Sequence, residues 1–204
     1  MTRLLLVRHA VTSENNSNRF WGSTDLPLSQ TGIEQAGRLR ERLATERIDT
    51  IYSSLLSRSR TTAEIIASSH GLGIYARSEL NECDFGEAEG LTFDEINARF
   101  PGLADALLGD DTATRFPGGE SLLEVFARVG RFREELDDHG ADSTICIVGH
   151  GASLQTLICH LLGVPPGHWR QFCLQRGSLS IIETYPGGAV LAGLNDINHL
   201  EGVD

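Results

Sequence analysis

The sequence contains no lysine. All 17 of its Lys and Arg residues are arginines, and its formal net charge is −11. The missing ammonium group excludes a P-loop, a lysine Schiff base and a Ser-Lys dyad, because each of these needs lysine itself. Any site that binds anions must therefore use arginine, histidine or backbone amides. The acidic balance also argues against nucleic acid or an anionic membrane as a partner, since both favour a clustered basic surface.

Long hydrophobic runs are absent as well. The N-terminal run is only "LLLV", whereas a signal-peptide core needs roughly 7 to 15 apolar residues and a membrane-spanning helix about 20. We therefore expect a cytoplasmic protein without a membrane partner. No C-x-x-C pair joins the cysteines, so we expect reduced thiols with packing roles. These are Cys83, Cys146, Cys159 and Cys173.

Length and composition suit one domain over residues 1–204. A chain of 204 residues is long enough to bury a full core. No Gly/Ser or Pro-rich stretch, charge run or internal repeat marks a linker.

Apolar runs and helical periodicities alternate along the chain. The runs at 3–8 and 143–150 are typical of buried parallel strands, and those at 48–54 and 73–77 indicate two more strands. Helical spacing occurs at 31–43, 57–71, about 120–138 and 151–163, with capping-box patterns at Thr31–Glu34 and Thr92–Glu95. Residues 178–195 read as a hairpin around "PGG". The pattern predicts an α/β fold, a three-layer α/β/α sandwich with a mostly parallel central sheet and a C-terminal hairpin.

Polar side chains follow the predicted parallel strands at the points where the strands end. The first strand ends at Arg8 and His9, the second leads to Arg58, and the strand at 143–150 ends at His150, while Glu82 comes after the third strand. Ligands of such sheets bind beyond the carboxyl ends of the strands, so we expect these groups to converge. Two guanidiniums, two imidazoles and one carboxyl predict a phosphate site.

Each of these groups has a role in phosphate-ester chemistry. Two arginines can grip a phosphoryl dianion through forked donors. An imidazole whose second nitrogen is fixed by a hydrogen bond can attack phosphorus, and the other imidazole and the amides after Gly151 can stabilise the developing charge. A carboxyl group can protonate the departing ester oxygen if it holds a proton at working pH.

The chain resembles the histidine phosphatase superfamily, also called the phosphoglycerate mutase-like family. The family signature R-H-G-x-T-x-x-N appears as "RHAVTSEN", and "SLLSRSRTTA", "LNECDFGEAEG" and "VGHGAS" match three further blocks in the same order. The resemblance implies a phosphorylated nucleophile at His9 and a proton donor at Glu82. It further implies phosphate ligands at Arg8, Arg58 and His150. Positions that usually contact phosphate or substrate are Thr12, Asn15, Trp21, Gly22 and Gly151. No metal or organic cofactor is implied.

One residue departs from the signature, and others compete with the assigned ones. Ala10 replaces the family glycine; an alanine can keep the amide donor if its backbone angles are ordinary, so we expect a mild effect. Arg60 lies two residues from Arg58 and does not share its helix face. For Glu87 and Glu89 we expect solvated loop positions. The remaining histidines have no motif support and are expected on the surface or in the core: His70, His139, His160, His168 and His199.

Other hydrolase chemistries lack sequence support. No cysteine is followed six positions later by arginine, as a cysteine phosphatase requires, and neither H-E-x-x-H nor G-x-S-x-G occurs.

The resemblance favours a phosphomonoesterase for a small phosphorylated metabolite, similar to α-ribazole phosphatases and broad-specificity bacterial phosphatases. Residues of about 83–140 are expected to contain an insertion that roofs the pocket, with Phe20, Trp21, Phe85 and Phe116 as an apolar wall. This segment lacks the lysine and paired arginines of the glycolytic mutases. Two alternatives stay open: phosphoglycerate mutase-type transfer, and a non-catalytic phosphate-binding protein. The oligomeric state is open too, with a homodimer the commonest form for such proteins.

Overall fold

A mixed six-stranded sheet forms the centre of the molecule in a computed structural model, which describes residues 1–14, 18–108 and 111–203, without the side chains of 106–108. The strand order is β3-β2-β4-β1-β5-β6. The first four strands of this order run parallel, and β5 and β6 are antiparallel additions next to β1. The strands are β1 Thr2–Arg8, β2 Thr50–Ser53, β3 Ile74–Ala76, β4 Thr144–Gly149, β5 Leu179–Tyr185 and β6 Gly188–Asp196. The predicted α/β sandwich and C-terminal hairpin are confirmed.

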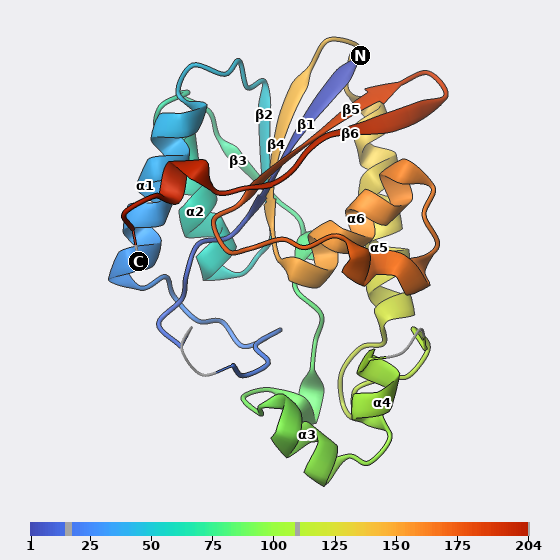
Figure 1. Cartoon of the computed structure of the whole chain (residues 1–204). Helices are drawn as coiled ribbons and strands as arrows, with labels where there is room; N and C mark the ends of the chain where they lie inside the picture. Colours follow the sequence, from blue (N-terminus) through green and yellow to red (C-terminus); the bar gives the residue numbers. More distant parts are fainter. Residues whose placement is uncertain (15–17, 109–110, 204) are drawn as a thin grey trace.

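Helices cover both faces of the sheet (Figure 1). One face packs against α1 (Gln30–Leu43) and α2 (Ser57–Ala67), the other against α5 (Leu122–Glu135) and α6 (Gly151–Leu162). The side chains of β1 alternate between the two: Leu5 and Val7 belong to the first core, Leu4 and Leu6 to the second. Burial on both faces explains why this strand is a continuous apolar run rather than an alternating one.

Residues between β3 and α5 extend beyond the carboxyl ends of the parallel strands (Figure 1). This segment contains α3 (Phe93–Arg99) and α4 (Leu103–Leu108). Short 3-10 helices lie at Ser78–Leu80, Gly86–Ala88, Leu136–Asp138, Pro166–Gln171 and Asn198–Leu200. Short irregular elements of this kind carry too little periodicity to be read from the sequence.

Helix caps correct one prediction and confirm another. The N-cap of α1 is Ser29, whose hydroxyl accepts from the Gly32 amide, so the predicted Thr31–Glu34 capping box is wrong. Thr92 does form its box with Glu95. The helix expected from about 120 begins later, because Ser121 caps it with Glu124.

Element ends differ elsewhere by a few residues. The strands expected at 48–54 and 73–77 are shorter, and the helix expected at 57–71 ends at Ala67.

All four cysteines are free thiols, and three are buried as expected, whereas Cys173 is exposed. Within the described part of the chain, no helix is long and apolar enough to cross a membrane.

Candidate active site

His9 lies directly after β1, 5% exposed, with its amide bonded to the Gly149 carbonyl of β4 at 2.9 Å. Its Nδ1 is 2.7 Å from the carbonyl oxygen of Ala10. A carbonyl oxygen only accepts, so Nδ1 carries the proton and Nε2 keeps its lone pair. The hydrogen bond therefore fixes the tautomer that a nucleophile needs.

The electrostatic surroundings keep His9 uncharged. Burial lowers the pKa of His9 well below 6.5, and the nearby guanidiniums of Arg8 and Arg58 lower it further. Ala10, the departure from the family glycine, does not have a positive φ, and its amide donates to Thr62 Oγ1 at 3.3 Å. Its backbone is thus one that any residue can adopt, as the expectation of a mild effect requires.

The two predicted phosphate arginines are held in different ways. Arg8 donates from Nη1 to the Leu174 carbonyl at 2.5 Å, while its buried Nε has no partner among the described residues. Arg58 is 2% exposed and donates to the carbonyls of Gly22 at 2.6 Å and Thr24 at 2.8 Å. Its neighbour Arg60 is exposed and pairs with Glu64 instead. Burial in the first turn of α2 thus singles out Arg58.

His150 stands behind His9, with ring centroids 4.9 Å apart. Its Nδ1 accepts from Arg58 Nε at 3.3 Å, so its Nε2 carries the proton and donates to Ser54 Oγ at 2.7 Å. Burial lowers the pKa of His150 well below 6.5, and His9 and Arg58 add to this. His150 is therefore neutral with both ring nitrogens engaged, and its contact with a phosphate stays a prediction.

Glu82 reaches the site from the segment after β3 and is 8% exposed. The amides of Cys83 and Ala152 each donate to its Oε1 at 3.0 Å. The second of these amides belongs to the first turn of α6, so the start of this helix positions the carboxyl group. A Cβ on Gly151 would lie 3.4 Å from Glu82 Oε2 and 3.5 Å from the Arg8 guanidinium, so this glycine lies close to both groups.

The loop that carries Glu82 is held by a guanidinium from α5, which the sequence analysis missed. Arg128 donates to the carbonyls of Glu79 at 2.6 Å, Asn81 at 2.8 Å and Glu82 at 3.0 Å. The same guanidinium pairs with Glu120 at 2.9 Å. A helical arginine seven residues after the Ser121 cap gives no local signal of this role, because all three carbonyls are more than 40 residues away.

Glu89 corrects another expectation. Instead of a solvated loop charge, its carboxylate accepts from the amides of Gly22 at 3.0 Å and Ser23 at 2.9 Å. A Cβ on Gly22 would lie 1.9 Å from the Cys83 carbonyl oxygen, which only glycine avoids. Glu87, by contrast, is exposed as expected and pairs with Arg99.

An open cavity of about 650 Å³ lies in front of His9. Six predicted site residues line it: Arg8, His9, Thr12, Trp21, Arg58 and Glu82. Three other predicted site residues do not line the cavity but lie next to residues that do: His150, Gly22 and Gly151. The predicted Asn15 lies outside the described residues. Trp21 presents a buried indole Nε1 that has no partner among the described residues. Arg176 also lines the cavity and was not predicted.

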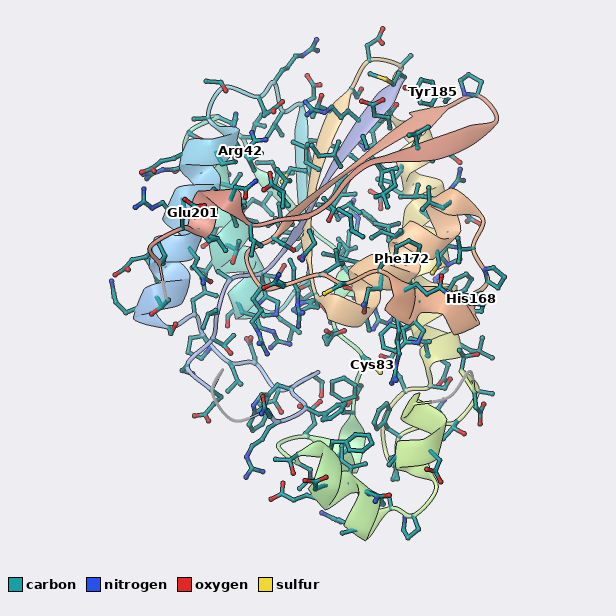
Figure 2. All side chains as sticks on the ribbon, in the orientation of Figure 1. Arg42, Cys83, His168, Phe172, Tyr185 and Glu201 are labelled. Atoms are coloured by element: carbon teal, nitrogen blue, oxygen red, sulfur yellow. The ribbon has the colours of Figure 1, made fainter. Side chains whose placement is uncertain are left out.

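A second cavity of about 590 Å³ adjoins the first and is mainly apolar. The two share Phe20 and Phe85. Phe116 lines the second one, as expected for the apolar wall, whereas Trp21 belongs to the first. Four further apolar side chains were not predicted: Leu103, Leu122, Ala152 and Trp169. Figure 2 shows Cys83, also a lining residue, between the sheet and the segment of α3 and α4.

Three of the other histidines have structural partners away from the two cavities. His139 contacts Tyr52, His160 the Phe126 carbonyl, and His199 the Gly177 carbonyl. Among the residues that the structure describes, no group of three or more His, Cys, Asp or Glu side chains could hold a metal ion.

Comparisons with known proteins agree over nearly the whole chain. The model of the histidine phosphatase superfamily (branch 1) matches residues 4–197. Phosphoserine phosphatase 1 of Hydrogenobacter thermophilus is 33% identical over 200 residues, 98% of this chain and 95% of that protein. A Salmonella choleraesuis protein named "Probable phosphoglycerate mutase GpmB" is 33% identical, over 98% of this chain and 96% of its own. The alpha-ribazole phosphatase of Shigella flexneri has a TM-score of 0.86 and 31% identity, covering 95% of this chain and 96% of that one.

Proposed function

The chain belongs to the histidine phosphatase superfamily, and on that premise we propose that it hydrolyses a small phosphate monoester through a phosphohistidine at His9. One observation carries the proposal. A neutral imidazole with its proton fixed on Nδ1 lines a cavity in which Arg8 Nε and Trp21 Nε1 have no partner among the described residues. Unpartnered buried donors around a nucleophile favour an anion in that cavity.

The first step transfers the phosphoryl group to the protein. The Nε2 lone pair of His9 attacks phosphorus, the bond from phosphorus to the ester oxygen breaks, and that oxygen takes the proton of the Glu82 carboxyl group. In the second step, the oxygen of a water molecule attacks phosphorus and gives a proton to the Glu82 carboxylate, while the bond from phosphorus to His9 Nε2 breaks and its electron pair returns to Nε2. Inorganic phosphate then leaves, and His9 and Glu82 return to their starting states.

Charge stabilisation comes from fixed donors around the phosphoryl group. Arg8 and Arg58 supply guanidinium forks, and the Gly151 amide opens α6, where helix N-termini favour anions. Backbone hydrogen bonds hold both arginines before substrate arrives. Little reorganisation is then needed in the transition state, which is the condition under which such donors are most effective.

The adjoining cavity supports a substrate with an apolar organic group. Its wall of aromatic and aliphatic side chains begins at Phe20 and Phe85, which it shares with the phosphate cavity. Residues of the segment 83–140, such as Leu103 and Phe116, contribute to it, which supports the proposed roofing role of this segment. An ester whose phosphate faces His9 would extend its organic part into this cavity.

A mutase remains the second candidate, favoured by the name of the Salmonella relative. A mutase must hold an acid such as phosphoglycerate and exclude water. None of the arginines that line the two cavities in the described structure comes from the segment 83–140, and Arg99, Arg115 and Arg128 of this segment pair with Glu87, Glu124 and Glu120. Hydrolysis is therefore favoured over transfer.

Phosphate release from a panel of monoesters tests the proposal. The panel holds α-ribazole phosphate, phosphoserine, sugar phosphates, nucleotides and 3-phosphoglycerate, and the variants are His9→Ala and, as a matched control at an exposed histidine, His168→Ala. We expect turnover that only His9→Ala abolishes, with label from substrate phosphate trapped on the wild-type chain. Transfer of that label to 3-phosphoglycerate instead of water would identify a mutase. Phosphate binding without any turnover would identify a non-catalytic binding protein.

A further inference from the structure

Arg176 precedes β5, and no motif singles it out. In the strand order β2-β4-β1-β5, Arg58 comes from the β2 side of His9 and Arg176 from the β5 side. Both line the cavity in front of His9. We propose that Arg176 is a third guanidinium of the phosphoryl site, on the flank of His9 opposite Arg58. This inference rests on the proposed function and adds a substrate-binding residue to it.

Backbone hydrogen bonds fix the turn that carries Arg176 to the end of β1. The Gly177 amide donates to the carbonyls of Arg8 at 3.0 Å and His9 at 3.1 Å, and the Arg8 amide donates to Ser178 at 3.2 Å. Gly177 has a φ of +72°, which favours glycine at this turn. Arg176 therefore starts from a backbone that is bonded to the nucleophile's own backbone.

The same turn is anchored on its other side. Leu174 accepts from the Arg8 guanidinium at 2.5 Å, and the Gln175 amide donates to Asn195 Oδ1 on β6 at 2.6 Å. The backbone of Arg176 is therefore fixed before any ligand arrives, and binding has to order only its side chain.

The guanidinium of Arg176 itself has no hydrogen bond or ion pair to any described residue. Burial lowers its pKa to about 10, and repulsion from Arg8 and Arg58 contributes, offset in part by Glu82. Three guanidiniums thus face one carboxyl group, while His9 next to them is neutral. An anion placed among them would remove this repulsion, and a phosphoryl dianion carries the charge to do so.

The test measures the affinity for inorganic phosphate by calorimetry at fixed ionic strength. Arg176→Gln should weaken binding roughly 10- to 100-fold, the loss expected for one hydrogen bond between charged groups. Arg176→Lys keeps the charge without the fork and should recover part of the affinity. Arg60→Gln removes an equal charge from the exposed face of α2 and should leave the affinity unchanged.

Thermal unfolding separates binding from structural support. Without phosphate, Arg176→Gln should melt at the same temperature as the wild type or higher, since it removes a repelled cation. With phosphate, the upward shift in melting temperature should be smaller than in the wild type. A lower melting temperature without phosphate, with phosphate affinity retained, would assign Arg176 a structural role and overturn the proposal.

Two further outcomes contradict the inference. If Arg176→Gln binds phosphate with an affinity within twofold of the wild type, the inference is overturned. If the variant raises KM only for phosphoserine and 3-phosphoglycerate, which carry a carboxylate, then Arg176 binds that carboxylate and not the phosphoryl group. Failure of the wild-type protein to bind phosphate at all would overturn it as well. The proposed function is decided separately by turnover: phosphate binding that depends on Arg176, in a protein that hydrolyses no ester, would support this inference while refuting the phosphatase.

Discussion

Replacing Arg128 with glutamine should slow the hydrolysis of esters with poor leaving groups far more than that of activated esters. Arg128 contacts no substrate; it holds the loop of Glu82 through three carbonyls and pairs with Glu120, with 12% and 25% of the two side chains exposed. Without it, the Glu82 carboxyl group loses its fixed position. In the proposed mechanism a poor leaving group needs the proton of that carboxyl, whereas a nitrophenolate leaves without it.

The magnitude follows from the interactions that are lost. Each hydrogen bond from a charged donor contributes about 1.5–3 kcal/mol. If one such restraint defines the productive position of Glu82, kcat for a poor leaving group falls roughly 10- to 100-fold, within the range of about 10²–10⁴ that general acid catalysis supplies. The free energy of unfolding should drop by about 2–3 kcal/mol, less than the 3–5 kcal/mol of a fully buried pair, because Glu120 remains partly hydrated.

The assay compares kcat for phenyl phosphate and 4-nitrophenyl phosphate in the wild type, Arg128→Gln and Arg128→Lys. Arg133→Gln is the control, since Arg133 lies on the same helix but forms an exposed pair with Asp137 at 2.5 Å. We expect a large loss for phenyl phosphate, a small loss for the nitrophenyl ester and partial recovery in Arg128→Lys. An equal loss for both esters, or the same loss in Arg133→Gln, would refute the positioning role.

Three other predictions follow from the site. Because the pKa values of His9 and His150 are lowered, the unfolded chain binds more protons than the folded one below pH 6.5, so stability should fall on acidification by about 1.4 kcal/mol per pH unit for each histidine. Denaturant unfolding between pH 7 and 5.5 checks this, and an unchanged slope in His9→Ala would contradict it. Gly22→Ala should lower the melting temperature and raise KM, since its Cβ meets the Cys83 carbonyl and shifts the Gly22 carbonyl, which accepts from Arg58. A melting temperature and a KM equal to those of the wild type would refute the close contact between Gly22 and the Cys83 carbonyl. Trp169→Ala should raise KM for phenyl phosphate about 3- to 10-fold but leave that for glycerol phosphate unchanged, as stacking in the apolar cavity predicts. Equal changes for both esters would argue against an organic group in that cavity.

Site residues that directly follow a strand could be predicted from the sequence, because the carboxyl ends of neighbouring parallel strands lie at the same edge of the sheet. The apolar runs before Arg8 and His150 have no polar residue on either face, so both strands had to be central, and central parallel strands end at the same edge. Arg58 needed only its position in the first turn of the following helix. The family blocks then separated it from Arg60.

Residues that act across the sheet could not be predicted in this way. Arg128 finds its partners through the packing of α5, and Arg176 enters the site because β5 pairs with β1 in antiparallel fashion. Neither pairing leaves a trace in local sequence spacing. The error at Thr31 has a similar cause: Ser29 also bonds to the Val11 carbonyl, and this distant contact fixes the helix start two residues earlier.

The neighbours of β1 also set an order of events during synthesis. β1 leaves the ribosome first, yet both strands that pair with it, β4 and β5, lie within residues 144–185. At about 5–20 residues per second, an apolar strand with two unpaired edges waits on the order of ten seconds for its partners. The turn at Gly177 closes on His9 only after that. The nascent chain thus carries His9 long before the pocket around it can form, and a chaperone that shields residues 3–8 would protect this unpaired apolar strand in the meantime.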